Sequence, residues 1–278
     1  MSAKAGGPVY KGVGKLPDRA LLLFSVLIYA FLYAPILVLI FFSFNSSRST
    51  QNWTGFSTEW YVALLQDQSI HSAFFNSMKV GVTATLIATV IGTLTALALT
   101  RHDFRGKLAA DTTIYAATVM PEIVVGVSLL VFFVATLIPL GVELGIVTIV
   151  IAHVAFTISF VTIVVRARLA GMDESLEEAA QDLGANPVTT FVRVTLPLIL
   201  PGVMAGGLLA FTLSFDDFVI TFFVSGVGSS TLPLKIYSMI KFGVSPVINA
   251  LSTVVMVSTM ILILGGGRIL ARRQGNAS

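Results

Sequence analysis

The stretch ALLLFSVLIYAFLYAPILVLIFFSF, residues 20–44, contains no charged side chain and is apolar almost throughout. A transmembrane helix needs about 20 such residues, whereas the apolar core of a cleaved signal peptide has only about 7–15. We therefore expect this stretch to be a retained membrane-spanning helix.

Further apolar runs of similar length follow at about residues 76–100, 112–138, 143–165, 198–223 and 248–270. Hydrophobic residues make up 55% of the chain and charged residues only 11%, against about 25% charged in an ordinary soluble domain. So few charges cannot cover a soluble surface, and they cluster between the apolar runs. The sequence predicts an all-α membrane protein with about six transmembrane helices.

The basic residues predict the orientation, because segments rich in Lys and Arg stay on the cytoplasmic side. If the N-terminus is inside, thirteen of the 17 basic residues lie inside. They are Lys4, Lys11, Lys15, Arg19, Arg101, Arg105, Lys107, Arg166, Arg168, Arg193, Arg268, Arg272 and Arg273, and only Arg48, Lys79, Lys235 and Lys241 lie outside. We expect cytoplasmic tails at 1–19 and 273–278 and a transmembrane domain at 20–272.

Several function classes find no support in the sequence. Cysteine is absent, so there is neither a disulfide framework nor a thiolate nucleophile. His71, His102 and His153 lack metal-ligand spacing, and no basic run with interleaved aromatics suggests nucleic-acid binding. We predict no catalytic residue, no bound metal and no cofactor in this chain, and no nucleic-acid partner.

The segment between the fourth and fifth apolar runs, about residues 166–197, differs from the other connections. Residues 173–184 read DESLEEAAQDLG, where acidic residues lead a run of helix formers, as at a helix N-terminus. Gly184 is expected to end that helix, and Asn186-Pro187 to begin another short one. The pattern predicts a short helix pair outside the bilayer, with a low-relief face at Ala179 and Ala180 that another protein can approach.

This segment resembles the EAA loop of ABC-importer permeases. The resemblance rests on Glu178-Ala179-Ala180, on Gly184, and on Val194-Thr195-Leu196-Pro197, where Val194 replaces the usual Ile. It implies a type I, MetI-like permease whose coupling helix, within about 172–197, docks on an ATP-binding subunit. The contact residues would be Glu178, Ala179, Ala180, Gly184 and Pro197. Because the chain has no GxxxxGK[ST] phosphate loop, we expect ATP and magnesium on separate ATPase subunits and no enzyme activity here.

Three carboxylates fall inside predicted spans, namely Glu122, Asp216 and Asp217. An Asp at a helix centre costs about 2.5–3.5 kcal/mol on insertion scales, so such groups usually face a pathway or a partner. At 1.5 Å per residue, Asp216 lies about 25 Å from the inner end of its span and Glu122 about 15 Å. They are expected to attract a cation. The alternative is protonation or hydrogen bonding between helices.

A second resemblance concerns the substrate. FNSSR at 44–48, AFTLSFDD at 210–217, TLPLKIYSM at 231–239 and GVSP at 243–246 are similar to permeases of the spermidine/putrescine importer family. The resemblance runs from about residue 20 to residue 270 and implies a role in polyamine passage for Trp53, Ser214, Asp216, Asp217 and Glu122. Glu122 stands where the family has Asp.

The chemistry of the substrate agrees with this resemblance, because carboxylates pair with ammonium groups. Aromatic faces such as Trp53 or Tyr237 add cation–π attraction of about 0.5–2 kcal/mol. The resemblance implies further partners: a second homologous permease, two ATP-binding subunits and an extracytoplasmic polyamine-binding protein. Two alternatives remain open, an ABC permease for another small solute and a proton-coupled secondary transporter with Asp216 and Asp217 as relay acids.

Overall fold

The computed structural model describes residues 18–48, 52–173, 175–243 and 245–275, and side chains only between residues 20 and 261. The predicted N-terminal tail therefore lies outside the described residues except for 18 and 19, and of the predicted C-terminal tail only 273–275 are described, as the end of a helix. Within the described ranges the chain is helical, and its single β-bridge joins Asn45 and Phe56. The chain divides into two compact units, residues 1–66 with 243–278, and residues 67–242.

The first unit contains α1 (Asp18–Ser43), α2 (Glu59–Gln66) and α12 (Pro246–Gly275), and α12 packs against both of the others. Asn45 organises the loop after α1. Its side-chain amide donates to the carbonyl oxygen of Asn52 at 2.8 Å, and its Oδ1 accepts from the backbone N–H of Thr54 at 3.0 Å. The indole of Trp60 donates to the Asn45 carbonyl at 2.6 Å. These bonds satisfy the buried polar groups of the loop.

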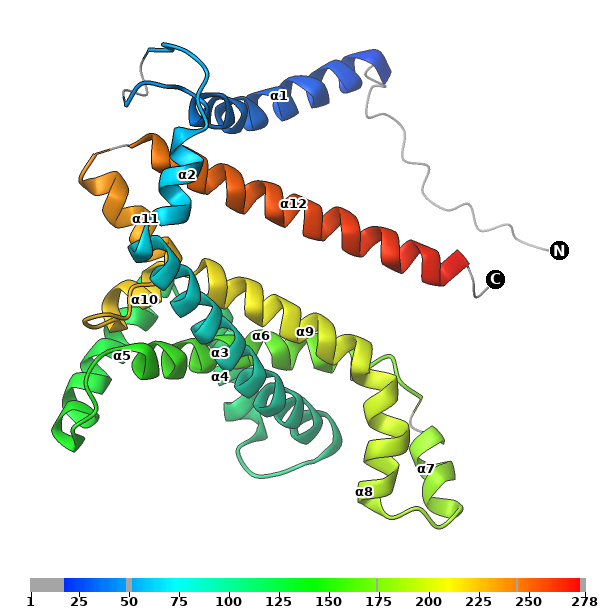
Figure 1. Cartoon of the computed structure of the whole chain (residues 1–278). Helices are drawn as coiled ribbons and strands as arrows, with labels where there is room; N and C mark the ends of the chain where they lie inside the picture. The colour runs from blue at the N-terminus through cyan, green and yellow to red at the C-terminus, as the bar shows by residue number, and fades with distance from the viewer. Residues whose placement is uncertain (1–17, 49–51, 174, 244, 276–278) are drawn as a thin grey trace. The chain divides into compact units, whose positions relative to one another are not determined.

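The second unit is built on three long helices, α3 (Gln68–Arg101), α6 (Ile146–Leu169) and α9 (Leu196–Asp216), which pack pairwise against one another (Figure 1). Around them lie α4 (Lys107–Val119), α5 (Glu122–Thr136), α10 (Val219–Val224) and α11 (Leu232–Lys241). The short elements are the 3₁₀-helix η1 (Ile138–Leu140), α7 (Ser175–Asp182), α8 (Pro187–Thr190) and the π-helix η2 (Phe191–Thr195).

Among the described residues, five helices are long and apolar enough to cross a membrane. They cover Ala20–Ser43, Gln68–Arg101, Glu122–Leu140, Ile146–Leu169 and Pro187–Asp216. The apolar part of α12 whose side chains the structure describes, Pro246–Ile261, is shorter. The prediction of an all-α protein with multiple membrane spans is confirmed.

Two predicted spans are wrong as continuous helices. The third breaks at Met120, whose ψ of 134° is extended, because the ring of Pro121 disfavours the α conformation in the residue before it. The fifth breaks at Asp217, with ψ of 126°. Asp216 ends α9, and α10 begins at Val219. Both breaks fall at acids predicted to act on a substrate.

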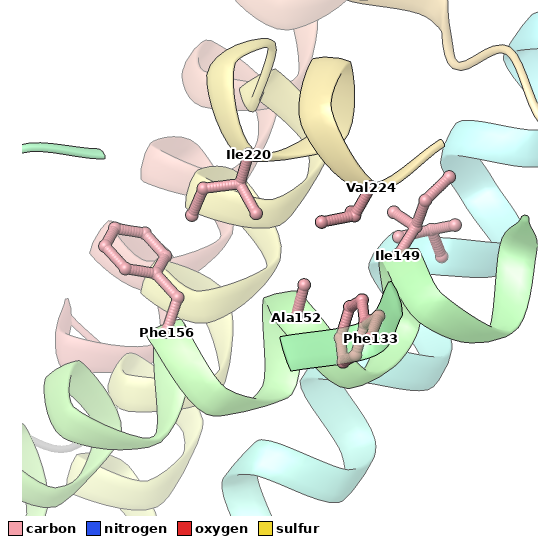
Figure 2. Close-up of a cluster of buried hydrophobic side chains, with 7 residues drawn as sticks. Phe133, Ile149, Ala152, Phe156, Ile220 and Val224 are labelled. Atoms are coloured by element: carbon pink, nitrogen blue, oxygen red, sulfur yellow. The ribbon is translucent and has the colours of Figure 1, made fainter. Parts of the chain in front are cut away.

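The second unit has two buried hydrophobic clusters, one between α3, α6 and α9 and one where α5, α6 and α10 meet. Figure 2 shows the second cluster, in which Phe133, Ile149, Ala152, Phe156, Ile220 and Val224 pack together, joined by Val80 of α3. Gly126 allows α10 to approach α5 closely, since a Cβ there would lie 2.8 Å from the Phe223 ring. Gly92 does the same for α3 and α6, because its Cβ would meet the Cβ of Val161 at 2.8 Å. Small residues at such crossings are typical of membrane helix packing.

Candidate transport site and coupling loop

The break between α9 and α10 is held by the carboxylate of Asp217. Its oxygens accept from the backbone N–H groups of Ile220 at 3.2 Å and Thr221 at 2.8 Å. The first N–H groups of a helix have no partner within the helix, so a carboxylate that accepts from them caps it. Asp217 therefore stabilises the start of α10 and fixes the point where α9 stops.

Asp217 also belongs to a buried polar network that joins three helices. His153 of α6 places Nε2 at 3.2 Å from Asp217 Oδ2 and 3.0 Å from Thr221 Oγ1, and Nδ1 at 2.7 Å from Ser214 Oγ. The Thr221 hydroxyl donates to Asp217 at 2.8 Å, so its oxygen is left to accept and Nε2 must carry the proton. In the neutral imidazole, Nδ1 then accepts from the Ser214 hydroxyl.

This network separates the two adjacent acids. The side chain of Asp217 is only 4% exposed, and Ser214 is buried as well, whereas Asp216 is exposed. The sequence placed Asp216, Asp217 and Ser214 together along one pathway. The structure gives Asp217 and Ser214 internal partners, whereas the carboxylate of Asp216 is exposed.

A cluster of aromatic side chains, Phe218, Phe222 and Tyr237, begins two residues after Asp216 in the chain. Tyr237 of α11 packs against Phe218 with ring centroids 4.6 Å apart, and against Phe222 at 6.4 Å. Tyr237 and Phe222 are both exposed. The break after Asp216 therefore presents a carboxylate close in sequence to a partly open aromatic surface, a combination that suits an organic cation.

Glu122 lies in the first turn of α5 and is exposed. The position of Glu122 along the neighbouring helix α6 follows from the contacts of α4 and α5, the two helices that flank the Pro121 break. Asp111 of α4 forms an ion pair with Arg166 near the end of α6, while Phe133 of α5 shares a core cluster with Ile149 near the start of α6. Helices α4 and α5 together therefore run antiparallel to α6. Glu122 lies between the Asp111–Arg166 contact and the Phe133–Ile149 contact, and so roughly midway along α6.

Trp53 belongs to the other unit, in the loop organised by Asn45. Its ring stacks on Phe41 of α1 with centroids 4.2 Å apart, and 41% of the residue is exposed. The stacking fixes the indole plane while one face stays available. Of the residues predicted to line a pathway, Trp53 is the one in the first unit.

The first helix of the predicted pair is present as α7, beside α8 in Figure 1. The second is wrong as a separate short helix, because α8 continues through η2 into α9 as one helical run over Pro187–Asp216. Gly184 turns the chain with φ of +88°, a conformation that costs glycine little. The N–H of Ala185 donates back to the carbonyl of Ala180 at 3.0 Å, and the side chain of Asn186 accepts from the N–H of Thr189 at 2.8 Å. The local capping signals therefore determine this loop.

The motif residues of the loop are available for contact. Glu178, Ala179, Gly184 and Pro197 are exposed and Ala180 is half-buried. Leu183 is 90% exposed.

The sequence reasoning missed the residues that anchor this loop. Glu177 Oε1 lies 3.3 Å from Arg101 Nη2 and accepts from the Thr195 hydroxyl at 2.7 Å. Nothing local singles out Glu177, because its partners come from segments 76 residues before it and 18 residues after it. Arg101 did carry a signal, as a basic residue at the end of a span, but it was counted only for orientation.

Comparison with known proteins places the chain. The family model described as "Binding-protein-dependent transport system inner membrane component" matches residues 88–275. The spermidine/putrescine transport system permease protein PotC of Escherichia coli K12 is 44% identical over 249 residues, covering 90% of this chain and 92% of that protein. The putrescine transport system permease protein PotI of the same strain is 45% identical over 231 residues, covering 82% of each. The chain belongs to the family of binding-protein-dependent transport system inner membrane components.

Solved structures agree in fold. A chain of a bacterial ABC transporter involved in the import of the acidic polysaccharide alginate has a TM-score of 0.72 at 16% identity, covering 94% of this chain and 99% of that chain. A chain of the MetNI methionine ABC transporter has a TM-score of 0.59 at 17% identity, covering 78% of this chain and 98% of that chain. The predicted MetI-like permease fold is confirmed.

Proposed function

We propose that this chain is the permease subunit of an ATP-driven importer that passes polyamines, spermidine or putrescine, into the cytoplasm. PotC and PotI, which it resembles over most of its length, are named for transport of these cations. The observation that carries the proposal is the exposed Asp216 at the α9–α10 break, followed by the aromatic group of Phe218 and Tyr237.

The chemistry of the break suits a flexible cation. Asp216 pairs with an ammonium group, while the face of Tyr237 attracts a second ammonium group or covers the methylene chain. Glu122 and Trp53 supply a further carboxylate and a further aromatic face. Asp217 and Ser214 act indirectly, because their polar atoms already hold the break in place. A few separated groups bind weakly enough for release.

We further propose that both termini are cytoplasmic and that α12 completes six crossings. The positive-inside rule supports this orientation, which puts the α7–α8 loop in the cytoplasm. It also places Asp216, at the far end of α9 from that loop, toward the outer side. A cation delivered from outside would then meet Asp216 early on its way.

The loop and the family support an assembly with other subunits. A structure of the bacterial alginate ABC transporter holds a periplasmic protein bound to an alginate pentasaccharide, and its permease chain has a TM-score of 0.67 with this one at 19% identity, covering 89% of this chain and 93% of that chain. We propose that this chain likewise works with an extracytoplasmic binding protein, a second permease and two ATP-binding subunits. These subunits would bind ATP and magnesium, and α7 would be the helix that docks on one of them.

Uptake of labelled spermidine and putrescine into cells that carry the whole importer tests the proposal. Asp216→Asn removes the charge and keeps the shape, so we expect uptake to fall by about tenfold or more, as for loss of a hydrogen-bonded charge pair. Glu143→Gln is the matched control, since Glu143 is also exposed and lies outside both breaks. Its uptake should equal that of the wild type.

Three results would contradict the proposal. Asp216→Asn with unchanged uptake of both polyamines would remove the cation role. Transport of a different solute in preference to both polyamines would change the substrate. Uptake that persists without ATP but follows a proton gradient would indicate a secondary transporter.

A further inference from the structure

Glu177 is the one acid of α7 that reaches two other helical segments among the described residues. A single carboxylate oxygen lies 3.3 Å from Arg101 Nη2, in the last turn of α3, and accepts from the Thr195 hydroxyl at 2.7 Å. The side chains of Arg101 and Glu177 are only 17% and 19% exposed, and Thr195 is buried. The carboxylate therefore ties α7 to α3 and to the segment that leads into α9.

The neighbouring polar side chains of α7 are more exposed than Glu177, although Glu178 and Gln181 line the same cavity. Glu178, Gln181 and Asp182 are exposed, as is Leu183 at the end of the helix. Helix α7 thus has an outer face that a partner can contact and an inner anchor at Glu177. Glu178 is exposed whereas the adjacent Glu177 is half-buried, because successive helix residues point about 100° apart.

The Glu177 anchor is connected with the α9–α10 break through the backbone of one continuous helical run. Thr195 is the last residue of the π-helix η2 (Phe191–Thr195), from which α9 continues directly to Asp216. A π-turn inside a helical run is rare and frequently marks a functional site. A force applied to α7 therefore reaches the segment that ends at the α9–α10 break through one side chain and one helix.

Space for movement lies next to the anchor. A cavity of about 440 Å³ is lined by Arg101 and Thr195, by Thr190, and by Glu177, Glu178 and Gln181 of α7. The Thr190 hydroxyl is buried and has no hydrogen-bond partner in the part of the chain that the structure describes. The cavity leaves α7 free to shift against α3, with Glu177 as the direct polar link across it.

We propose that Glu177 is a positioning residue that transmits displacement of α7 to α3 and α9. This inference rests on the proposed function, in which α7 docks on an ATP-binding subunit. Glu178 then meets the partner, whereas Glu177 carries the movement inward. Loss of Glu177 uncouples ATP hydrolysis from transport and leaves docking intact.

The test uses the complete importer in proteoliposomes, with spermidine uptake and ATP hydrolysis measured on the same preparation. For Glu177→Ala we expect co-purification of all subunits, ATP hydrolysis close to wild type, and uptake per ATP lowered by about tenfold, within the range of known coupling effects. Glu143→Gln is the control, since Glu143 is an exposed acid outside α7 and outside both helix breaks, and its uptake per ATP stays unchanged. If Glu177 had only a structural role, its loss would lower assembly, ATP hydrolysis and uptake together, and uptake per ATP would stay unaltered.

Thr195→Val provides a second, nearly isosteric variant in case Glu177→Ala does not assemble. It removes only the hydroxyl that donates to Glu177, so uptake per ATP should fall in the same direction by a smaller factor. Unchanged uptake per ATP in Thr195→Val, or in an assembled Glu177→Ala, overturns the inference. A wild-type importer without ATP-dependent uptake of either spermidine or putrescine would instead refute the proposed function, so the two failures are distinguishable.

Discussion

The adjacent carboxylates Asp216 and Asp217 offer a sharp test, because the structure gives them opposite roles. Asp217 accepts four hydrogen bonds, from two backbone N–H groups, the Thr221 hydroxyl and His153 Nε2. Asp216 is exposed. Replacing Asp217 should therefore destabilise the fold, whereas replacing Asp216 should impair uptake alone.

The magnitude follows from the lost partners. Removing a helix cap costs about 1 kcal/mol, and leaving a buried donor unsatisfied costs about 1–3 kcal/mol, although membrane side-chain hydrogen bonds average about 0.6 kcal/mol. We expect Asp217→Ala to lower the free energy of unfolding by about 2–4 kcal/mol. At about 2–4 °C per kcal/mol for a chain of 150–250 residues, Tm falls by about 4–16 °C.

The assay is thermal unfolding of the purified permease in detergent, followed by the fraction that stays monodisperse after heating. Asp217→Asn should fall between Asp217→Ala and the wild type, because the amide keeps one acceptor and turns an NH₂ group toward the donors. Asp216→Asn should change stability by no more than about 0.5 kcal/mol. Equal destabilisation by both Asn variants, or an unchanged Tm for Asp217→Ala, would refute the capping role.

Two further predictions concern packing and pH. Gly92→Leu should destabilise the second unit by about 1–3 kcal/mol through overpacking, measured as the same Tm shift, because even a Cβ at Gly92 would lie 2.8 Å from Val161 Cβ. Gly145→Ala, where an added Cβ meets nothing within 4 Å, is its control. Asp67 caps α3. Partial burial raises the pKa of its carboxyl, but the hydrogen bonds from Ser69 and from the Ile70 N–H, together with the charge of Lys235, lower it by more, so the pKa lies below its usual value of 3.8. Because the pKa of Asp67 is depressed in the folded state, the cap stabilises the fold at pH values above the unfolded pKa, and this stabilisation is lost as the pH falls through the folded pKa. Between pH 6 and pH 3, the Tm of Asp67→Asn should therefore fall by less than the Tm of the wild type. An equal fall in the two proteins would contradict the capping role.

The sequence by itself determined the helical membrane class and the α7–α8 loop. Runs such as 20–44 predict helices because only a helix satisfies its own backbone in lipid. The loop followed from local rules, since Gly184 and Asn186 act on neighbours within a few residues. The EAA resemblance added the prediction that an ATP-binding subunit docks on this loop.

Only the tertiary structure decided which acid faces outward and where the spans break. Asp216 and Asp217 look alike in sequence, and their difference comes from His153, 64 residues from Asp217. Likewise Glu177 gained its role from Arg101, 76 residues earlier in the chain. Side-chain hydrogen bonds between distant helices leave no local pattern, so helix periodicity could not reveal them. The sequence therefore determined the elements and the loop, whereas long-range polar contacts determined which carboxylates support the fold and which remain free to meet a cation.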